Sequence, residues 1–321
     1  MARLCGDRHD RRVPALHHDE LLIDTDLVRR LVTRSFPEYA DARIARLPSS
    51  GSSNALFRLG VELLVRLPRQ PGGSATIEKE AGWLPVIAAG LTTAVPEVVA
   101  LGEPGFGYPE RWAVTRWIDG HPPAVPWDPA LTGSSRGLAH DLAQVITELR
   151  EIPVPTAARS DPALGWYRGG PLADLDEDFR IWVTGCRDLS SLDLDLDHAL
   201  RIWDRALATE VAAEPRAGWY HGDLFAENLL VRDGRLAAVL DFGGLAVGDG
   251  TVDLVVAWEV LDADGRQAFW HALDVDDSSR LRSMGWALAI AMMTLSYYWH
   301  TMPARCASRL AMATAVLSVE S

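Results

Sequence analysis

The sequence predicts an α+β fold made of two lobes, a small N-terminal lobe built on an antiparallel sheet and a larger, mainly helical C-terminal lobe. Short apolar segments separated by turn residues occupy the first third of the chain, and longer amphipathic segments occupy most of the remainder. The length of 321 residues favours two lobes around one cleft over a single core. A hydrophobic content of 48% provides enough apolar side chains for a core in each lobe.

The N-terminal lobe is expected to span residues 19–118. Residues 1–18 are rich in Arg, His and Asp without periodicity, so we expect them to form a mobile tail. A helix capped by Asp24 or Thr25 should follow, because apolar residues recur at helical spacing after them. Apolar segments bounded by turns predict an antiparallel sheet with five strands, at residues 43–47, 55–59, 63–67, 95–101 and 112–118. A helix predicted at 74–87 would pack against this sheet.

The C-terminal lobe is expected to span residues 119–321, starting at a proline-rich turn that reads DGHPP. Helical periodicity predicts amphipathic helices at residues 135–150, 179–184, 198–211, 252–260, 265–272 and 280–298. The most apolar run, 286–299, is too short to span a bilayer and is interrupted by Ser296 and two tyrosines. We therefore interpret it as a buried helix of the larger lobe.

The composition restricts the partners of the chain. A formal charge of −13 argues against nucleic acid, because its phosphates require clustered Lys and Arg, and favours a cationic partner. Cys5, Cys186 and Cys306 lie far apart and include no pair at metal-ligand spacing, which indicates reduced thiols in the cytoplasm. The polar N-terminus lacks the apolar stretch of a signal peptide. We expect a soluble, cytoplasmic protein without a membrane or nucleic-acid partner.

The most informative feature is a strand-turn-strand segment flanked by polar residues. Residues 221–228 read HGDLFAEN, and thirteen positions after Asn228 comes Asp241, the first residue of the triplet DFG. Two apolar strands, at 229–231 and 236–240, enclose an Asp-Gly turn between them. The resulting hairpin would bring Asn228 and Asp241 to the same end, a few ångströms apart.

This spacing is typical of phosphoryl transfer. In such a site one carboxylate orients the attacking hydroxyl, while an amide oxygen and a second carboxylate hold the magnesium ion on the triphosphate. The spacing therefore predicts Asp223 as the catalytic residue and Asn228 and Asp241 as the metal ligands. His221 is interpreted as a structural histidine that hydrogen-bonds the backbone near the loop.

A nucleotide-binding loop is expected between the first two strands, where residues 49–54 read SSGSSN. Small residues let backbone amides and hydroxyls approach phosphate oxygens, although a generic hairpin turn is the alternative. The candidate nucleotide contacts in this loop are Ser50, Gly51, Ser52 and Ser53. Thr115 and Trp117 precede the lobe boundary, where a crossing chain can offer its backbone to adenine.

Arg66 on the third strand is the candidate phosphate clamp. Kinases normally place a lysine at this position, paired with a glutamate on the following helix. The chain has a single lysine, Lys79, which is not on that strand and is expected to face solvent. The guanidinium fork can bind phosphate in a bidentate manner, with Glu80 as its expected partner and Glu78 as a second choice. An exposed strand residue is the alternative for Arg66.

Over roughly residues 40–300 the chain resembles the aminoglycoside phosphotransferase family, a bacterial group related to choline kinases and, more distantly, to protein kinases. The resemblance includes the Ser/Gly loop, the strand segment VRLP with Arg66, the Glu80 helix and the segment WIDG at 117–120. Its most specific part is the HGD…N…DFG pattern, followed by GDGTVDL at 248–254.

The resemblance implies a protein-kinase-like two-lobe fold that uses Mg²⁺ and ATP, with GTP as an alternative. The aspartate that positions the acceptor hydroxyl would be Asp223, and the last aspartate of GDGTVDL, Asp253, would brace the catalytic loop. Two residues depart from the family pattern: Arg66 replaces the usual lysine, and Gly250 stands where proline is common. Macrolide-modifying relatives tend to lack the asparagine, so Asn228 counts against that branch.

Two acidic stretches are candidates for lining the path of the acceptor to the catalytic loop. One is DLDED at 174–178, and the other consists of Glu259, Asp262 and Asp264. Clustered carboxylates suit a polyamine, because each ammonium gains charge-assisted hydrogen bonds. The alternative is a solvated helix start, where acids favour the positive end of the dipole. Three tryptophans are candidate flat walls for a sugar or macrocycle, with core packing as the alternative: Trp258, Trp270 and Trp299.

The sequence therefore predicts an ATP-dependent O-phosphotransferase that acts on a small hydroxylated, cationic molecule, foremost an aminoglycoside-like antibiotic. A metabolite kinase of the choline, homoserine or sugar-amine type is the alternative within kinases. A non-catalytic nucleotide-binding homologue is the alternative from another class, and the missing strand lysine motivates it. A protein kinase is disfavoured, because no extended segment ending in Ala-Pro-Glu follows Asp241.

Overall fold

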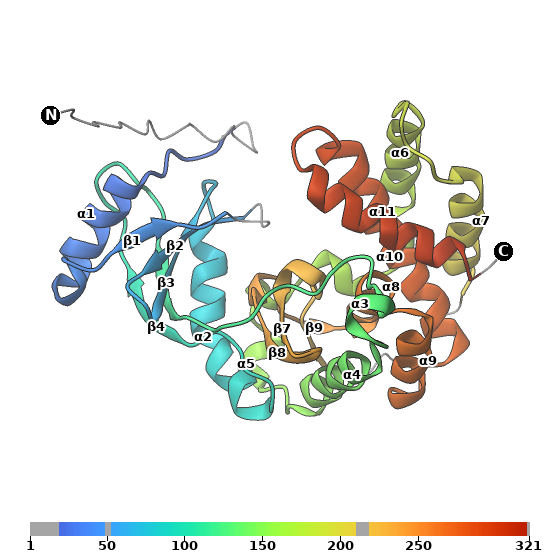
Figure 1. The fold of residues 1–321 in the computed structure, drawn as a ribbon, viewed down its shortest axis with the longest axis horizontal. Coiled ribbons are helices and arrows are strands. Elements are labelled where there is room, and N and C mark those ends of the chain that lie inside the picture. Colours follow the sequence, from blue (N-terminus) through green and yellow to red (C-terminus); the bar gives the residue numbers. More distant parts are fainter. Residues whose placement is uncertain (1–18, 49–52, 210–217, 320–321) are drawn as a thin grey trace, which may run out of the picture.

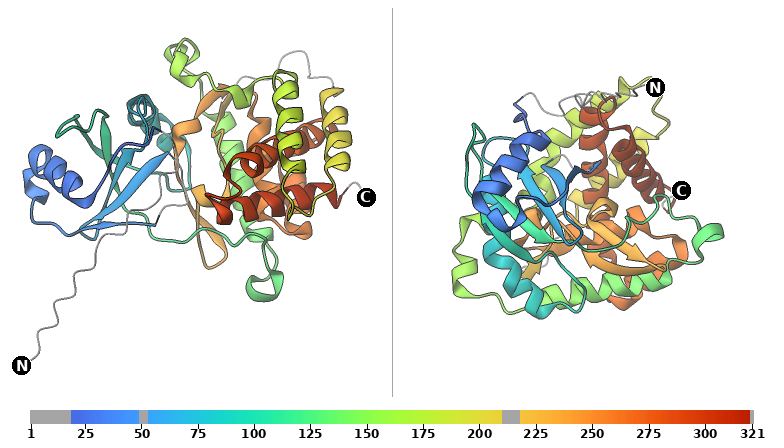
Figure 2. Two further views of the ribbon diagram at one scale, coloured as in Figure 1. Left: turned by 90° about the horizontal axis from the view of Figure 1, so that it is seen from above. Right: turned by 60° about the vertical axis from the view of Figure 1, so that its left-hand side comes forward.

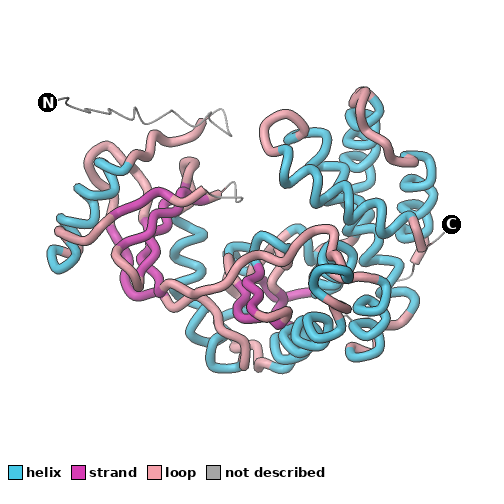
Figure 3. Tube along the Cα trace, in the orientation of Figure 1, coloured by secondary structure: helices cyan, strands magenta, loops and turns pink. Residues whose placement is uncertain are grey.

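The computed structural model describes residues 19–48, 53–209 and 218–319 (Figure 1). The tail predicted for residues 1–18 lies outside these ranges. Strands gather in the N-terminal part and in a small central hairpin, and helices make up most of the C-terminal part (Figure 3). This arrangement confirms the predicted α+β fold with a small antiparallel-sheet part and a larger helical part.

The N-terminal part is a five-stranded antiparallel sheet in the order β1-β2-β3-β5-β4. Its strands have these bounds: β1 Ile44–Arg46, β2 Asn54–Leu59, β3 Leu63–Pro68, β4 Val98–Gly102 and β5 Trp112–Arg116. The predicted strands at 95–101 and 112–118 are thus present, although β4 begins at Val98 and β5 ends at Arg116. Helices flank the sheet on both sides (Figure 1): α1 Thr25–Ser35 and α2 Ser74–Gly90.

Each flanking helix begins at a side chain that satisfies its first backbone amides. The Asp24 carboxylate accepts the N–H of Leu27 at 2.7 Å, which confirms the predicted cap of α1. The Glu110 carboxylate accepts the N–H groups of Gly72 and Ser74 and fixes the start of α2. The apolar face of α1 packs on the sheet and forms the N-terminal core with residues such as Phe57.

The C-terminal part is mainly helical, and its described residues also form four short strands. Its helices are α3 Pro129–Thr132, α4 Arg136–Glu151, α5 Thr156–Arg159, α6 Asp176–Arg187, α7 Leu196–Leu207, α8 Val256–Val260, α9 Ala263–Ala272, α10 Asp277–Tyr298 and α11 Pro303–Leu317. Its strands are β6 Gly218–Tyr220, β7 Leu229–Arg232, β8 Arg235–Val239 and β9 Ala246–Gly248. The predicted segment 252–260 is a 3-10 helix, Gly250–Val255, followed by α8. The strands β6 and β9 and the helix α11 were not predicted.

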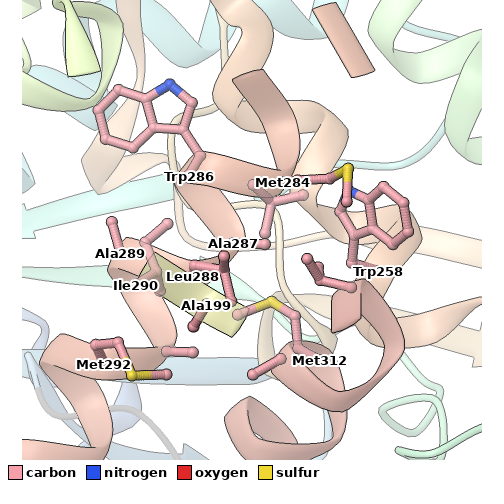
Figure 4. Packing of buried hydrophobic residues seen from close by; sticks show 14 of the residues in the cluster. Ala199, Trp258, Met284, Trp286, Ala287, Leu288, Ala289, Ile290, Met292 and Met312 are labelled. Carbon is pink, nitrogen blue, oxygen red and sulfur yellow. The ribbon is translucent and has the colours of Figure 1, made fainter. Parts of the chain in front are cut away.

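The helix α10 lies at the centre of the larger core, as predicted for the apolar run 286–299. It is buried along most of its length and contacts α6, α7 and α11. Figure 4 shows Met284, Leu288 and Met292 of α10 packed together with Trp258 and Met312. None of the described helices has both the length and the apolar character that crossing a bilayer requires.

A second core joins the two parts of the molecule. Leu84 and Ile87 of α2 pack in the same cluster as Leu142 and Ile146 of α4 and Phe242. The views in Figure 2 place α2 between the sheet and the C-terminal helices. The sheet and the helical part are therefore held together by buried apolar contacts.

Candidate active site

The hairpin β7–β8 positions the polar residues of the predicted motif. Leu229 pairs with Val239, and the N–H of Leu240 donates to the carbonyl of Asn228 at 2.8 Å, so the pairing continues to the end of the hairpin. The turn residues Asp233 and Gly234 both have positive φ, 51° and 72°, as a tight two-residue hairpin turn requires. Asn228 and the residue after Leu240, Asp241, therefore lie at the same end, as the sequence predicted.

Asp223 and Asn228 are in direct contact. The amide Nδ2 of Asn228 donates to the backbone carbonyl of Asp223 at 2.9 Å and to its carboxylate Oδ2 at 3.0 Å. The amide oxygen of Asn228 is therefore the atom of this side chain that can accept a hydrogen bond or bind a cation. The carboxylate of Asp223 is 34% exposed and lines a cavity of about 520 Å³.

The backbone of the loop that carries Asp223 is held by the carboxylate of Asp253. Its Oδ2 accepts the N–H of His221 at 2.7 Å and its Oδ1 accepts the N–H of Gly222 at 2.8 Å. All three residues are buried. The ring of His221 accepts the N–H of Asp223 at Nδ1 and lies 3.0 Å from the carbonyl of Leu240 through Nε2. A proton on Nε2 satisfies both contacts, so the ring bridges the loop and the hairpin.

Asp241 adopts a left-handed conformation, with φ of 56° and ψ of 73°. Aspartate tolerates this region because its short side chain can bond the local backbone, and here Oδ1 accepts the N–H of Gly243 at 3.4 Å. The turn directs the carboxylate to the cavity that Asp223 and Asn228 also line.

Arg66 connects the sheet to this carboxylate. Its Nη1 lies 2.7 Å from Oε2 of Glu80, which is the partner expected from the sequence, and its Nη2 lies 3.3 Å from Oδ1 of Asp241. Burial disfavours the charge on Arg66, but Glu80 and Asp241 outweigh it and raise the pKa of the guanidinium above its ordinary value. The guanidinium therefore stays charged between two carboxylates.

The prediction that Lys79 faces solvent is wrong. Lys79 is 9% exposed, lines the large cavity and donates from Nζ to the carbonyl of Leu245 at 3.2 Å. Burial lowers the pKa of its ammonium, while the charges of Glu80 and Asp241 oppose that shift. Its neighbours in sequence are both glutamates, which suggested a solvated face, but the turn of α2 points Lys79 into the molecule.

A narrower cavity of about 220 Å³ adjoins the large one and shares Asn228 and Asp241 with it. Thr115, Trp117 and Arg66 line this second cavity on the sheet side, and Leu230 and Leu240 line it from the hairpin. Its mainly apolar walls suit a flat base. Ser53 lines the large cavity, whereas Ser50, Gly51 and Ser52 lie outside the described residues.

Arg168 is a site residue that sequence reasoning missed. Its guanidinium forms an ion pair with Asp223 and donates from Nη1 to the carbonyl of Gly222 at 3.0 Å. Burial by itself raises the pKa of the Asp223 carboxyl, but the charge and hydrogen bond of Arg168 outweigh burial and lower that pKa. Arg168 belongs to a short 3-10 helix, Tyr167–Gly169, far from the motif in sequence, so no local spacing indicated the contact.

The acidic residues predicted to line the acceptor path do not do so. Glu259 is 3% exposed, pairs with Arg309 and accepts the N–H of Ala226 at 2.7 Å. Asp262 caps α9 through the N–H of Gly265, and Asp264 is exposed on the same helix. The described residues that line the large cavity include none of these three.

The other acceptor candidates also have structural roles. The acids of 174–178 lie at the start of α6, where Asp176 accepts the indole N–H of Trp203 at 2.8 Å. Trp258 is buried and packs against Trp270 with ring centroids 5.4 Å apart, so the core alternative holds for this pair. The described residues lining the large cavity contain a different aromatic set: Trp166, Tyr167, Phe225 and Tyr298.

The donors at the end of the hairpin fit a magnesium ion. Mg²⁺ prefers oxygen ligands and is commonly held by one or two protein groups together with phosphate oxygens. The amide oxygen of Asn228 and the carboxylate of Asp241 are such donors, and they share both cavities. These two donors therefore stand where the two cavities meet, and Asp223 lines the larger of them.

Comparison with protein families gives a match to the phosphotransferase enzyme family over residues 44–285, well over half of the chain. The match covers the five-stranded sheet, the hairpin and the segment with Asp253, and it ends within α10. No match was found among curated proteins.

Solved structures of antibiotic phosphotransferases have the same fold at low sequence identity. An APH(2") enzyme in complex with GDP and kanamycin is 20% identical with a TM-score of 0.64, covering 92% of this chain and 98% of that one. ADP-bound APH(2'')-Ib is 17% identical with a TM-score of 0.61 and coverages of 92% and 99%. Macrolide 2'-phosphotransferase MphH from Brachybacterium faecium is 19% identical with a TM-score of 0.57 and coverages of 91% and 97%.

Proposed function

Since the chain belongs to the phosphotransferase enzyme family, we propose that it transfers the γ-phosphoryl group of ATP to a hydroxyl group of a small molecule. The observation that carries this proposal is the common cavity of Asp223, Asn228 and Asp241. GTP is the alternative donor, and two of the solved relatives were crystallised with GDP or ADP. A non-catalytic nucleotide-binding protein is disfavoured, because all three polar residues of the motif are present.

In the proposed reaction each polar residue has one role. Asp223 orients the acceptor hydroxyl and takes its proton as the new oxygen–phosphorus bond forms and the bond to the β-phosphate oxygen breaks. Asn228 and Asp241 would hold Mg²⁺, which when bound neutralises charge on the triphosphate. Arg66, fixed by Glu80, would bind phosphate oxygens from the sheet side. Thr115 and Trp117 would contact the base in the narrower cavity.

His221 and Asp253 would act on the backbone that carries these groups. Both hold the loop by hydrogen bonds and neither needs to touch the substrate. Ser53, which precedes β2 and lines the large cavity, would contact the phosphates.

Two classes of acceptor have support. An aminoglycoside-like antibiotic is suggested by solved relatives that were crystallised with kanamycin and gentamicin. A less basic hydroxylated molecule, such as a metabolite, is favoured by the positions of Glu259, Asp262 and Asp264 away from the cavity, since a polyamine would need such carboxylates.

The test is phosphate transfer from labelled ATP across a panel of aminoglycosides, macrolides and hydroxylated metabolites. Replacing Asp223 by Asn should lower kcat with the accepted substrate by roughly a thousandfold or more, because the aligned hydroxyl loses its proton acceptor. Nucleotide affinity should stay within about threefold, since Asp223 does not hold the triphosphate. Turnover retained by the Asp223→Asn variant would refute the assignment.

A further inference from the structure

We infer that the acceptor is a hydroxylated molecule that is uncharged around its reacting hydroxyl and has an apolar or aromatic body, so that ammonium groups do not hold it. The inference rests on the proposed function and names the substrate class of the same cavity. It starts from the charges on the cavity wall: each carboxylate among the described lining residues already has an arginine partner.

Two of these carboxylates belong to the reaction itself. Asp223 is paired with Arg168, and Asp241 lies 3.3 Å from a guanidinium nitrogen of Arg66. A cationic acceptor that bound either of them would compete with a buried arginine and with the chemistry assigned to that carboxylate.

The third carboxylate, Glu227, lies farther along the wall and is held by two arginines of α11. Its Oε1 is 3.1 Å from Nη2 of Arg305 and 2.7 Å from Nη2 of Arg309. Arg309 also pairs with the buried Glu259, and its guanidinium lies 3.9 Å from the centre of the Phe225 ring. Glu227 is therefore part of a packed network and is only 11% exposed.

Cations outnumber carboxylates on this wall although the whole chain has a formal charge of −13. The described lining residues carry four basic groups against three acidic ones: Lys79, Arg168, Arg305 and Arg309 against Asp223, Glu227 and Asp241. A polycation would meet repulsion here and would find its possible partners already engaged. Arg305 and Arg309 lie beyond the residues that match the family, so the family match does not determine this charge pattern.

The remaining wall offers apolar and aromatic contacts. Trp166 and Tyr167 are both more than one-third exposed, with ring centroids 4.9 Å apart, and Phe225, Tyr298 and Met293 also line the cavity. Partly exposed aromatic rings bind flat or apolar bodies and the apolar faces of sugars. The cavity thus selects the body of the acceptor by shape and apolar contact, and Asp223 aligns its hydroxyl group.

The first experiment compares two probes that share their hydroxyl groups and differ in charge: kanamycin and kanamycin with all amino groups acetylated. Binding to the wild-type protein is measured by calorimetry in the presence of Mg²⁺ and a non-hydrolysable ATP analogue. We expect the neutral probe to bind at least as tightly as kanamycin, and kanamycin to show no saturable binding below about 1 mM. Micromolar binding of kanamycin that weakens as salt is added would overturn the inference.

The second experiment changes the wall charge. Arg305→Glu places a carboxylate beside Glu227 and should raise kanamycin affinity at least about tenfold, with little effect on the acetylated probe. Arg201→Glu is the matched control, because this substitution makes the same change in net charge. Arg201 lies on α7 with its side chain 64% exposed. If Arg305→Glu does not raise the affinity for kanamycin, or if Arg201→Glu raises it equally, then the charge of Arg305 does not exclude cationic acceptors from the cavity.

The two proposals fail in different ways. Rapid phosphorylation of kanamycin by the wild-type protein would leave the proposed function intact and reject the substrate class. Absence of binding when the ATP analogue itself is titrated into the protein with Mg²⁺ would reject the proposed function, while the relative affinities of the two kanamycin probes would still report on the charge of the cavity wall.

Discussion

At the scale of single residues, the ion pair between Arg168 and Asp223 decides how the proposed catalytic carboxylate titrates. Arg168 is buried, and its Nε also bonds the hydroxyl of Tyr167 at 2.9 Å, so the guanidinium is fixed on both sides. A neighbouring positive charge favours the ionised form of a carboxyl. Arg168 therefore keeps Asp223 ready to accept a proton at and below neutral pH.

Replacing Arg168 by Gln should move the acid limb of the pH profile of kcat/KM to higher pH. Asp223 has a lowered pKa in the folded protein, so its activity is lost only as the pH falls through that low value. Without Arg168 the pKa of Asp223 rises, and the loss should occur at least about one pH unit higher. Arg168→Lys keeps the charge and should shift the limb less. An unchanged acid limb in Arg168→Gln would show that Arg168 does not control Asp223.

The sequence reveals site residues only where local spacing fixes their geometry. Asn228 and Asp241 are predictable because one hairpin of alternating apolar residues joins them. The partner of Arg66 is predictable because a single helix follows its strand. Arg168 contacts Asp223 from 55 positions away, and the path between them depends on the packing of several helices. The burial of Lys79 similarly depends on where α2 meets the loop after Asp241, which helical periodicity cannot show.

At the scale of elements, the loop that carries Asp223 is supported by the 3-10 helix Gly250–Val255 through Asp253. The two N–H groups that Asp253 accepts belong to buried backbone, and no water can replace the carboxylate without opening the core. An unpaired buried donor costs about 1–3 kcal/mol. Asp253 is therefore one of the buried side chains that keep the loop carrying Asp223 rigid, beside His221 and Arg168.

Asp253→Ala should lower the free energy of unfolding by about 2–5 kcal/mol, since two buried N–H groups lose their acceptor. Urea unfolding monitored by tryptophan fluorescence measures this loss. Asp253→Asn is the graded control, because its amide keeps one acceptor oxygen and should lose less stability. A loss below about 0.5 kcal/mol in the alanine variant would show that the loop does not need this support.

Prediction from sequence also has limits at this scale. Amphipathic helices such as α4 follow from periodicity, and the sheet strands follow from short apolar segments between turns. The strands β6 and β9 have three residues each, which is too short to show the alternation of apolar and polar residues that marks a strand. They also pair with each other although the hairpin β7–β8 separates them in the sequence. The helix α11 did carry a signal, a proline at its first position and apolar residues at helical spacing.

At the scale of the whole molecule, the two parts meet at an apolar cluster and at several polar contacts, one of which is a bridge within the site. The cluster joins α2 to α4, and the bridge is the contact of Arg66 from the sheet with Asp241 from the hairpin. In the proposed function Mg²⁺ and nucleotide would bind between these same residues. Nucleotide binding should therefore stabilise both parts against unfolding, and it should do so only when both Arg66 and Asp241 are present.

This coupling predicts a magnesium-dependent rise in melting temperature. With Mg²⁺ and ADP at one hundred times the dissociation constant, binding adds about 2.7 kcal/mol, which corresponds to roughly 5 °C for a chain of this size. ADP without Mg²⁺ should give a smaller shift. Asp241→Asn should abolish the difference between the two conditions, because a neutral amide replaces the proposed metal-binding carboxylate. Glu97→Gln is the control: Glu97 lies outside both site cavities with its side chain 68% exposed, so the full shift should remain. If Asp241→Asn keeps a magnesium-dependent shift equal to that of the wild type, then Asp241 does not bind the metal, and the proposed site would have to be reassigned.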